Sequence, residues 1–455
     1  ERCVRAVANG LAFAQAQLRS VRAADLPDTV AIEVIVPYLV ARLHDGLARL
    51  RSSDVSGLDA WRGRVRLPLP RGMTDEVLRA LTAALASDTP PHIKVLHSLE
   101  VVGDLAPRVR GVPRLASGTV GASPAATVAW MGAPPVDRSG AAIGYLRRVI
   151  AQHGGPVACV IPITNFERAW AVNSLAMAGL AHHAPRSLGP RMAAVLGRRA
   201  IGGGDGMPPD ADTSSGTLAA LRNLGVVARD GLLRPYDAGT HFYTWAGERT
   251  ASPTTNAHVL TALTTSDGRR TAWRTSAIQR IVTWLCDVQH RDGYWSDKWH
   301  ASPYYATACV VSALREAVQL GFITEARPAA RVTAAIDRAV AWVLASQHRT
   351  GWWGRWIGSA EETAYALQIL LYRADPDRRT RTAARRGLRF LQSAQDSDPL
   401  PLWHGKELYA PVHVARAAVI GSRHLAEVAL GLTDANGAGS AGRPARRPSQ
   451  AILAG

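Results

Sequence analysis

Hydrophobic positions along most of the chain recur with the period of an amphipathic helix. Segments with apolar residues at i, i+3, i+4 and i+7 are 77–87, 168–183, 215–225 and 363–373. Alternation typical of a strand is scarce; its best candidate is VACVIPI at 157–163, where Pro162 disfavours a strand. Short loops rich in Gly, Pro and Asp are spread evenly, as in an array of helices. We therefore predict an all-α protein.

A short internal repeat lies in the C-terminal half. QHRDGYW at 289–295 and QHRTGWW at 347–353 both fit Q-x-x-x-G-x-W, each where a predicted helix ends. Glycine permits a tight turn, tryptophan can fill the gap between neighbouring helices, and the Gln amide can cap a helix terminus. A degenerate third copy is at 391–403. Helical hairpins stacked in this way predict an α-barrel; the alternative is unrelated turns in a protein with 13 tryptophans.

Length and composition limit the class of protein. With 455 residues the chain has room for two or three domains, and no apolar run approaches the roughly 18 residues that a membrane-spanning helix needs. No secretion signal is recognisable at the N-terminus. The four cysteines lack the paired spacing of a disulfide framework or zinc site. We expect a reduced, cytoplasmic enzyme without integral membrane contact.

The charge is strongly positive, with 53 basic against 36 acidic residues and a formal net charge of +17. This excess suits a polyanionic partner such as nucleic acid, an anionic membrane surface or a phosphorylated small molecule. The only lysines are Lys94, Lys298 and Lys406; all other cationic side chains are arginine. A codon bias towards arginine explains the imbalance, and a position that kept lysine under it is a candidate for a compact ammonium beside a diphosphate or metal.

The segment PPDADTSSGTLAAL at 208–221 carries the clearest candidate chemistry. Two prolines predict a turn, Asp210 and Asp212 follow, and Thr213 or Ser214 can cap the helix that begins there. The acids alone can be explained as favourable charges at a helix start. Alternatively, one carboxyl group stays protonated in an apolar pocket while the other adjusts its acidity. Such a neutral carboxyl group is a strong general acid towards an alkene.

Together with the D-x-D segment, the repeats resemble the class II, protonation-initiated terpene cyclases, especially bacterial cyclases of the copalyl and drimenyl diphosphate type. Further blocks similar to that family are IEVIVPYLV (32–40), KVLHSLE (94–100), GASPAATVAWM (121–131), IPITNFERAWAVNSL (161–175), SPTTNAHVLTAL (252–263), WSDKWHASPYYATA (295–308), EETAYAL (361–367) and LWHGKELYAPVHVARAAV (402–419). The likeness extends over roughly residues 1–430.

The resemblance implies two α-barrel domains with the substrate cavity between them. A γ domain is expected at 1–155 and a β domain at 156–430, followed by a disordered tail at 431–455. Family members usually begin with further helices of the β barrel, whereas this sequence starts inside γ. We therefore expect that further residues precede those given.

The resemblance also implies a mechanism. Asp212 matches the acid that protonates the terminal alkene of an isoprenoid diphosphate, and Asp210 matches the residue that tunes it. Thr213 replaces the last Asp of the family's D-x-D-D motif, so this D-x-D-T-S resembles the D-x-D-T-T variant of drimenyl diphosphate formation. This favours cyclisation of farnesyl diphosphate to a bicyclic drimenyl diphosphate with the diphosphate retained. The alternative is a diterpene cyclase that converts geranylgeranyl diphosphate to a copalyl-type diphosphate.

His97 in HSLE matches the terminal base of plant ent-copalyl diphosphate cyclases, where it works with an asparagine. The matching place here holds Cys159 or Val160, so that dyad is incomplete. His97 could otherwise be a hydrogen-bonded histidine between helices. Glu100 is a candidate ligand for the Mg²⁺ that accompanies the diphosphate, because hard oxygen ligands suit this ion, or else a structural carboxylate.

For the diphosphate we expect Lys298 and Lys406, which lie in family-like blocks, with Lys94 as a weaker candidate. The residues expected to line the hydrocarbon pocket are Trp299, His300, Tyr304 and Tyr305. Aromatic faces stabilise cations without offering a nucleophile. The alternative from another class is a helical-repeat scaffold that binds polyanions, with basic residues along one face and no buried acid. The family-like blocks favour the cyclase, whose partner is a prenyl diphosphate and not nucleic acid.

Overall fold

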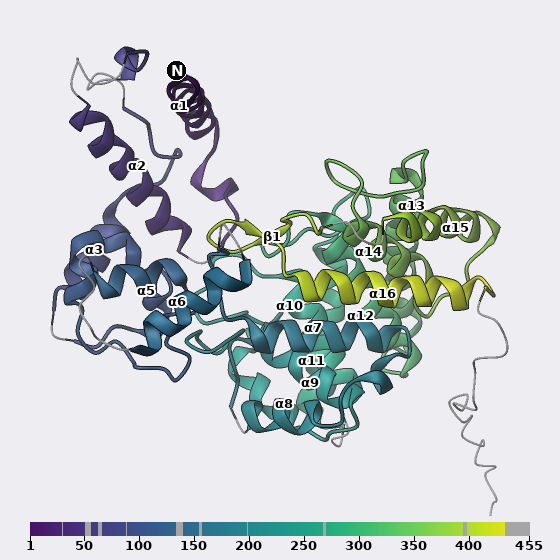
Figure 1. Ribbon diagram of the computed structural model, residues 1–455. Coiled ribbons are helices and arrows are strands. Elements are labelled where there is room, and N and C mark those ends of the chain that lie inside the picture. Colours follow the sequence, from purple (N-terminus) through teal and green to yellow (C-terminus); the bar gives the residue numbers. More distant parts are fainter. Residues whose placement is uncertain are drawn as a thin grey trace, which may run out of the picture.

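The computed structural model confirms the all-α prediction (Figure 1). It describes residues 1–29, 31–50, 56–61, 66–87, 89–132, 140–153, 157–197, 199–266, 270–394 and 398–432. The only strands among these residues are β1 (Trp403–His404) and β2 (Leu408–Tyr409), which form one short antiparallel pair. The described part of 157–163 contains no strand, as Pro162 predicted. No helix in the described ranges has the length and apolar character needed to cross a membrane.

Six helices of the C-terminal part form a closed ring. In ring order, each packs on the next, and the last packs on the first. They are α7 (Thr164–Met177), α9 (Ala211–Asn223), α10 (Pro253–Thr265), α12 (Pro303–Gln319), α14 (Ala360–Leu371) and α16 (Val412–Ala429). Around them lie α8 (Leu188–Leu196), α11 (Ala272–Asp287), α13 (Ala326–Ser346) and α15 (Arg378–Ser393), together with the short η4 (Ala181–His183) and η5 (Asp230–Tyr236). The predicted barrel is therefore present over this part of the chain.

Local sequence explains where the ring helices begin. α10 and α12 both start at a Ser-Pro pair, in which the serine side chain accepts a backbone N–H of the first turn and proline occupies the first helical position. Ser359 caps α14 in the same way. Four ring helices, α9, α10, α12 and α14, are buried along most of their length; α14 is buried at every residue from Glu361 to Leu371. This pattern fits helices enclosed by an outer layer.

The elements of the N-terminal part lie to one side of the ring (Figure 1), and they have separate cores. Its elements are α1 (Arg2–Ser20), η1 (Ala23–Asp25), α2 (Ile32–Arg49), η2 (Asp59–Trp61), α3 (Glu76–Leu85), α4 (Ile93–Leu96), η3 (Leu99–Arg108), α5 (Pro124–Met131) and α6 (Gly140–His153). One core joins α2, α3, η3 and α5, and a smaller one joins α1 to the other half of α2. The division into γ and β domains at residue 155 stays a prediction, and the tail expected at 431–455 lies outside the described residues beyond 432.

The two Q-x-x-x-G-x-W repeats adopt the same local structure. Trp295 and Trp353 are almost fully buried, and each indole N–H donates to a carbonyl oxygen near the end of the preceding helix, Leu285 O and Val343 O, at 2.8 Å. The tryptophan therefore fills the gap between helices, as predicted, and also caps the helix.

The role predicted for the glutamine was partly wrong. Gln347 Nε2 donates to Gly351 O and to Ala383 O in the middle of α15, and Gln289 makes the equivalent pair of bonds. The amide thus joins the turn to the next outer helix and does not cap a helix end. In the degenerate third copy, the indole of Trp403 donates to Glu361 Oε1 instead of a helix carbonyl.

The glycine of the second repeat is required by conformation and by space. Gly351 has φ +103°, and a Cβ there would lie 2.7 Å from Arg386 O. We therefore expect Gly351→Ala to lower the free energy of unfolding by roughly 2–4 kcal/mol, since it combines left-handed backbone strain with a clash against fixed backbone. Gly321→Ala is the matched control, because Gly321 also has positive φ but open space around it; about 1 kcal/mol is expected. Equal losses in chemical denaturation would show that the contact with Arg386 is unimportant.

Candidate active site

A cavity lies where the N-terminal part meets the C-terminal ring. His97 lines it from the N-terminal side, and Asp210, Asp212 and Thr213 line it from the start of α9. Most of the remaining wall is apolar or aromatic. Its aromatic members are Phe166, Trp245, Trp299, Trp403 and Tyr409. The candidate acid and the candidate base from the sequence therefore share one largely apolar space.

Asp210 is the N-cap of α9, a role that the sequence assigned to Thr213 or Ser214. Its Oδ1 accepts the Thr213 N–H at 2.5 Å, and its Oδ2 accepts the Thr213 hydroxyl at 3.0 Å. Burial, reinforced by the charge of Asp212, raises the pKa of Asp210 to about 8, although the bonds from Thr213 oppose this shift. Near neutral pH Asp210 is therefore largely uncharged.

Asp212 is held by a histidine from the neighbouring ring helix. His258 Nδ1 on α10 lies 2.8 Å from Asp212 Oδ1, and both side chains are mostly buried. Burial alone would lower the pKa of His258, but the charge of Asp212 and this hydrogen bond outweigh burial and raise it to about 10. Asp212 faces the cavity, whereas His258 lines a second cavity enclosed by the ring helices. The pair therefore contains a transferable proton at the wall of the first cavity.

His97 is arranged to accept a proton from the cavity. Its Nδ1 lies 2.6 Å from Gly121 O, and because a carbonyl only accepts, Nδ1 carries the hydrogen and Nε2 keeps its lone pair. Burial and then the nearby Lys406 ammonium lower the pKa of His97 to about 3, so the ring is neutral. Val160 lines the same cavity, whereas the Cys159 N–H donates to Glu407. The backbone carbonyl of Gly121 thus orients His97 here, without an asparagine.

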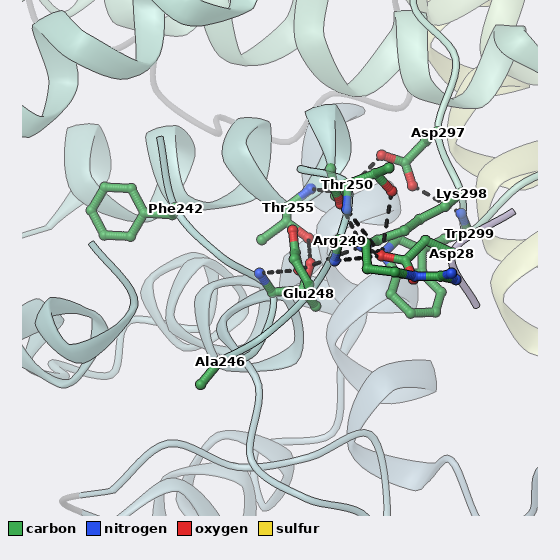
Figure 2. Close-up of polar contacts among 12 residues, drawn as sticks. Asp28, Phe242, Ala246, Glu248, Arg249, Thr250, Thr255, Asp297, Lys298 and Trp299 are labelled. Atoms are coloured by element: carbon green, nitrogen blue, oxygen red, sulfur yellow. Dashed lines mark hydrogen bonds and ion pairs between the residues drawn. The ribbon is translucent and has the colours of Figure 1, made fainter. Parts of the chain in front are cut away.

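Lys298 is buried beside the cavity and is surrounded by acceptors (Figure 2). Its Nζ donates to Thr250 O at 2.6 Å and lies 3.4 Å from Asp28 Oδ2 and 3.5 Å from Glu248 Oε2. The ammonium also lies over the rings of Trp245 and Trp299, both of which line the cavity.

Lys406 and Glu100, predicted to act on the diphosphate and the metal respectively, are paired with each other. Lys406 Nζ lies 2.6 Å from Glu100 Oε1 and 2.7 Å from Ser123 Oγ. The other oxygen, Glu100 Oε2, is buried without a hydrogen-bond partner in the described structure. Lys94, the weaker candidate, donates to Ala246 O at 2.9 Å and lies over the Trp245 ring.

The four residues predicted to line the hydrocarbon pocket do not lie in one place. Trp299 lines the cavity with the acid, and Tyr305 lines the second cavity, where its hydroxyl accepts the Trp170 indole N–H at 2.7 Å. His300 is buried against Tyr305 and Trp403, and Tyr304 is buried against Trp342. The structure therefore places His300 and Tyr304 in the packed interior, away from the wall of either cavity.

Sequence reasoning missed His258, Trp245 and Glu248. His258 lies in the quoted block SPTTNAHVLTAL, where a histidine within an apolar helix was the available signal. Trp245 and Glu248 lie in an irregular loop between η5 and α10, where periodicity gives no information. His404 and Trp403 also line the cavity and belong to the block LWHGKELY.

Comparisons with known proteins give relatives that match most of the chain. A family model described as the squalene-hopene cyclase C-terminal domain matches residues 249–413. The chain is 41% identical over 425 residues to ent-copalyl diphosphate synthase of Streptomyces sp. (strain KO-3988), covering 92% of this chain and 79% of that relative. It is 36% identical over 406 residues to labda-7,13-dienyl diphosphate synthase of Streptomyces clavuligerus, covering 87% and 71%. The solved structure of ent-copalyl diphosphate synthase from Streptomyces platensis superposes with a TM-score of 0.78 at 39% identity, covering 89% of this chain and 77% of that one.

The Asp212–His258 pair generates a prediction for stability. Because the pKa of His258 is raised from 6.5 to about 10, the folded protein keeps a proton that the unfolded chain loses in this interval. The pair's contribution is complete below about pH 6.5 and is lost as pH rises through about 10. His258→Gln should reduce the decline in unfolding free energy over this range by a few kcal/mol in chemical denaturation. The control is the exposed His183→Gln; identical pH slopes for the wild type and both variants would contradict the ion pair.

Proposed function

Since the chain belongs to the class II terpene cyclases, we propose that it converts geranylgeranyl diphosphate into a bicyclic, copalyl-type diphosphate with the diphosphate retained. The observation that carries this proposal is the carboxyl group of Asp212, bonded to His258 at the wall of a cavity with largely apolar surroundings. The scaffold alternative predicted no buried acid, and Asp210 and Asp212 at this wall speak against it.

The chain length of the substrate is inferred from the relatives. Two of them are named for copalyl and labdadienyl diphosphates, which are C20 products. These names support the diterpene alternative over the farnesyl diphosphate reading that the D-x-D-T-S motif favoured. The C15 reading depended on Thr213 alone. In the structure the hydroxyl group of Thr213 donates a hydrogen bond to Asp210. Thr213 therefore acts on the acid pair and gives little information about the tail.

In the proposed reaction, Asp212 donates a proton to the terminal alkene of the substrate. Asp210 is largely uncharged, and the proton shared between His258 Nδ1 and Asp212 Oδ1 is the one that Asp212 passes to the alkene. After transfer, the positive charge that His258 carried is on the substrate, and a neutral His258 ring and the Asp212 carboxylate remain. Because Asp210 is largely uncharged, it places no second negative charge beside Asp212.

The aromatic wall serves the cationic part of the reaction. Positive charge moves along the hydrocarbon chain as rings close, and water would quench it. Phe166, Trp299 and Trp403 present ring faces or edges instead of nucleophiles. Phe166 and Trp403 pack edge to face at 5.3 Å, which gives the wall a fixed shape.

We assign to His97 the role of the base that accepts the final proton from the carbocation. The His97 ring lines the cavity, Nδ1 is bonded to Gly121 O so that Nε2 keeps its lone pair, and its low basicity is sufficient because a tertiary carbocation is a very strong acid. The proton donor therefore comes from the C-terminal ring and the acceptor from the N-terminal part.

The residues present also fit the Mg²⁺ that class II cyclases of diphosphates use. No group of three or more His, Cys, Asp or Glu forms a ready metal cage within the described ranges. Mg²⁺ that arrives with a diphosphate needs only one or two protein carboxylates, and Glu100 Oε2 and Glu248 Oε1 are buried without a hydrogen-bond partner in the described chain. When bound, the ion neutralises part of the diphosphate charge. Lys298, Lys406 and Lys94 supply the protein's cations for the same group.

Substitution of the acid tests the initiation step. Asp212→Asn should lower the rate of cyclisation at least about a hundredfold, because the transferable proton is lost while the shape is kept. Dephosphorylated products of incubations with Mg²⁺ and geranylgeranyl diphosphate are measured by gas chromatography, and substrate binding by calorimetry. Thr213→Val, which removes one bond to Asp210, is the milder comparison and should retain more activity. Near-normal turnover in Asp212→Asn would remove Asp212 from the role of acid.

Parallel incubation of the wild type with farnesyl and geranylgeranyl diphosphates tests the substrate. We expect kcat/KM for geranylgeranyl diphosphate to exceed that for farnesyl diphosphate by at least about tenfold, since a site built for four isoprene units binds the shorter tail with fewer apolar contacts. A preference for farnesyl diphosphate would restore the drimenyl reading.

Substitution of His97 tests the termination step. His97→Ala should leave protonation by Asp212 in place but change the position from which the final proton is lost, so the mixture of alkene isomers changes. Product ratios in the same chromatographic assay give the answer. An unchanged single product at unchanged rate would show that another group accepts the proton.

A further inference from the structure

Glu361 is a buried carboxylate that lies directly behind one wall of the cavity. It is the second residue of α14 and is 2% exposed. Its Oε1 accepts the Trp403 indole N–H at 2.8 Å and the Tyr365 hydroxyl at 3.0 Å. Trp403 is itself a wall residue of the cavity that contains Asp212. Glu361 is therefore one hydrogen bond away from the space in which the substrate would react.

This contact differs from those of the two complete Q-x-x-x-G-x-W repeats. There the indoles of Trp295 and Trp353 donate to neutral backbone carbonyls, Leu285 O and Val343 O, and neither ring is among the residues that line the cavity with the acid. A neutral carbonyl is thus sufficient to hold a tryptophan in this fold. The carboxylate behind Trp403 supplies a negative charge that the task of holding the ring does not require.

The charge of Glu361 has no close counter-ion among the described residues. His300 Nε2 lies 3.7 Å from Oε1, beyond hydrogen-bond distance. Arg416 and Arg423 line a surface hollow together with Glu361, yet neither lies within ion-pair distance of it in the described chain. Oε2 is buried there without a hydrogen-bond partner. Because charges interact strongly in a buried, poorly polarisable environment, the carboxylate acts mainly on the two groups that donate to Oε1.

We propose that Glu361 is a positioning residue that increases the ability of Trp403 to stabilise a carbocation. A hydrogen bond to a carboxylate polarises the indole and raises the negative charge on its π-system above that of an indole bonded to a neutral carbonyl. A cation beside such a ring is attracted more strongly. Trp403 also packs against Phe166 and Tyr305, with ring centres 5.3 Å and 4.6 Å away, so its orientation is fixed. This inference rests on the proposed cyclisation, in which positive charge crosses the cavity.

Glu361→Gln separates the charge from the contact. The amide oxygen can accept the indole and hydroxyl donors in place of Oε1, and the amide nitrogen replaces Oε2, which has no partner to lose within the described residues. We expect kcat to fall about tenfold and KM to change by less than about twofold, since the cation exists only after the substrate has bound. The substrate is whichever of geranylgeranyl and farnesyl diphosphate the wild type cyclises, and circular dichroism establishes that each variant is folded.

A double-mutant cycle tests whether the effect passes through the indole. In a Trp403→Phe background no indole N–H remains to be polarised, so adding Glu361→Gln should change kcat by less than about twofold.

Glu362→Gln is the matched control. Glu362 is the next residue of α14 and is 1% exposed, and its oxygens accept the Ser359 hydroxyl and the Arg355 N–H, each at 2.8 Å. Its substitution removes the same charge without touching the indole contact, so kcat should stay within about twofold of the wild type.

The indole N–H resonance gives a measurement that does not depend on turnover. In protein labelled with ¹⁵N-tryptophan, Trp403→Phe identifies the Trp403 peak by its loss. Glu361→Gln should move this peak upfield by more than its linewidth, because a hydrogen bond to a neutral acceptor is weaker, whereas Glu362→Gln should leave it in place.

Three results would overturn the role of Glu361 in an active enzyme: an unmoved Trp403 peak, an unchanged kcat in Glu361→Gln, or the same tenfold loss in the Trp403→Phe background. A wild type that cyclises neither prenyl diphosphate would instead refute the proposed function, and the role of Glu361 with it. The two failures are therefore distinguished by the wild-type incubations.

Discussion

The chemistry proposed for this protein depends on one hydrogen bond between two ring helices, the 2.8 Å contact of His258 with Asp212. An aspartate at a largely apolar wall would be costly to keep ionised and would lose its orientation without a partner. His258 shares a proton with the Asp212 carboxyl group and also fixes its orientation. The ring explains why this pairing is possible, because α9 and α10 are adjacent and their starts are fixed by the Asp210 and Ser252 caps. Fold and acid are therefore specified by the same few residues.

Much of the architecture could be predicted from the sequence, because it follows from local rules. Helical periodicity and the two Gly/Trp repeats are short-range signals, and the predicted helices and tight turns are present. Gln347 was harder to interpret, since its amide bonds Ala383, 36 residues later, and only the packing of α15 decides that contact. The third repeat differs for a similar reason: Trp403 finds a buried carboxylate, Glu361, in place of a helix end.

The site was predictable to the extent that its residues form motifs. Asp210, Asp212 and His97 were found in this way, and they share one cavity. His258 was not found, because it is 46 residues from its partner. Tyr304 and Tyr305 are neighbours on α12, and one helical step separates a residue packed on Trp342 from one that lines the inner cavity. Sequence alone does not orient a helix that is buried on nearly all sides.

Thr244 lies between Glu248 and the start of α9. Its N–H donates to Glu248, and its carbonyl accepts the Ala211 N–H beside Asp212, at 2.6 Å and 2.8 Å. The two groups lie in consecutive peptide planes that meet at the Thr244 Cα, so one residue separates the hydrogen bond to Glu248 from the first turn of α9. In the proposed reaction, a head group bound near Glu248 is thereby linked through Thr244 to the position of Asp212. A molecule with the hydrocarbon tail but no anionic head group would lack this link under the proposed mechanism.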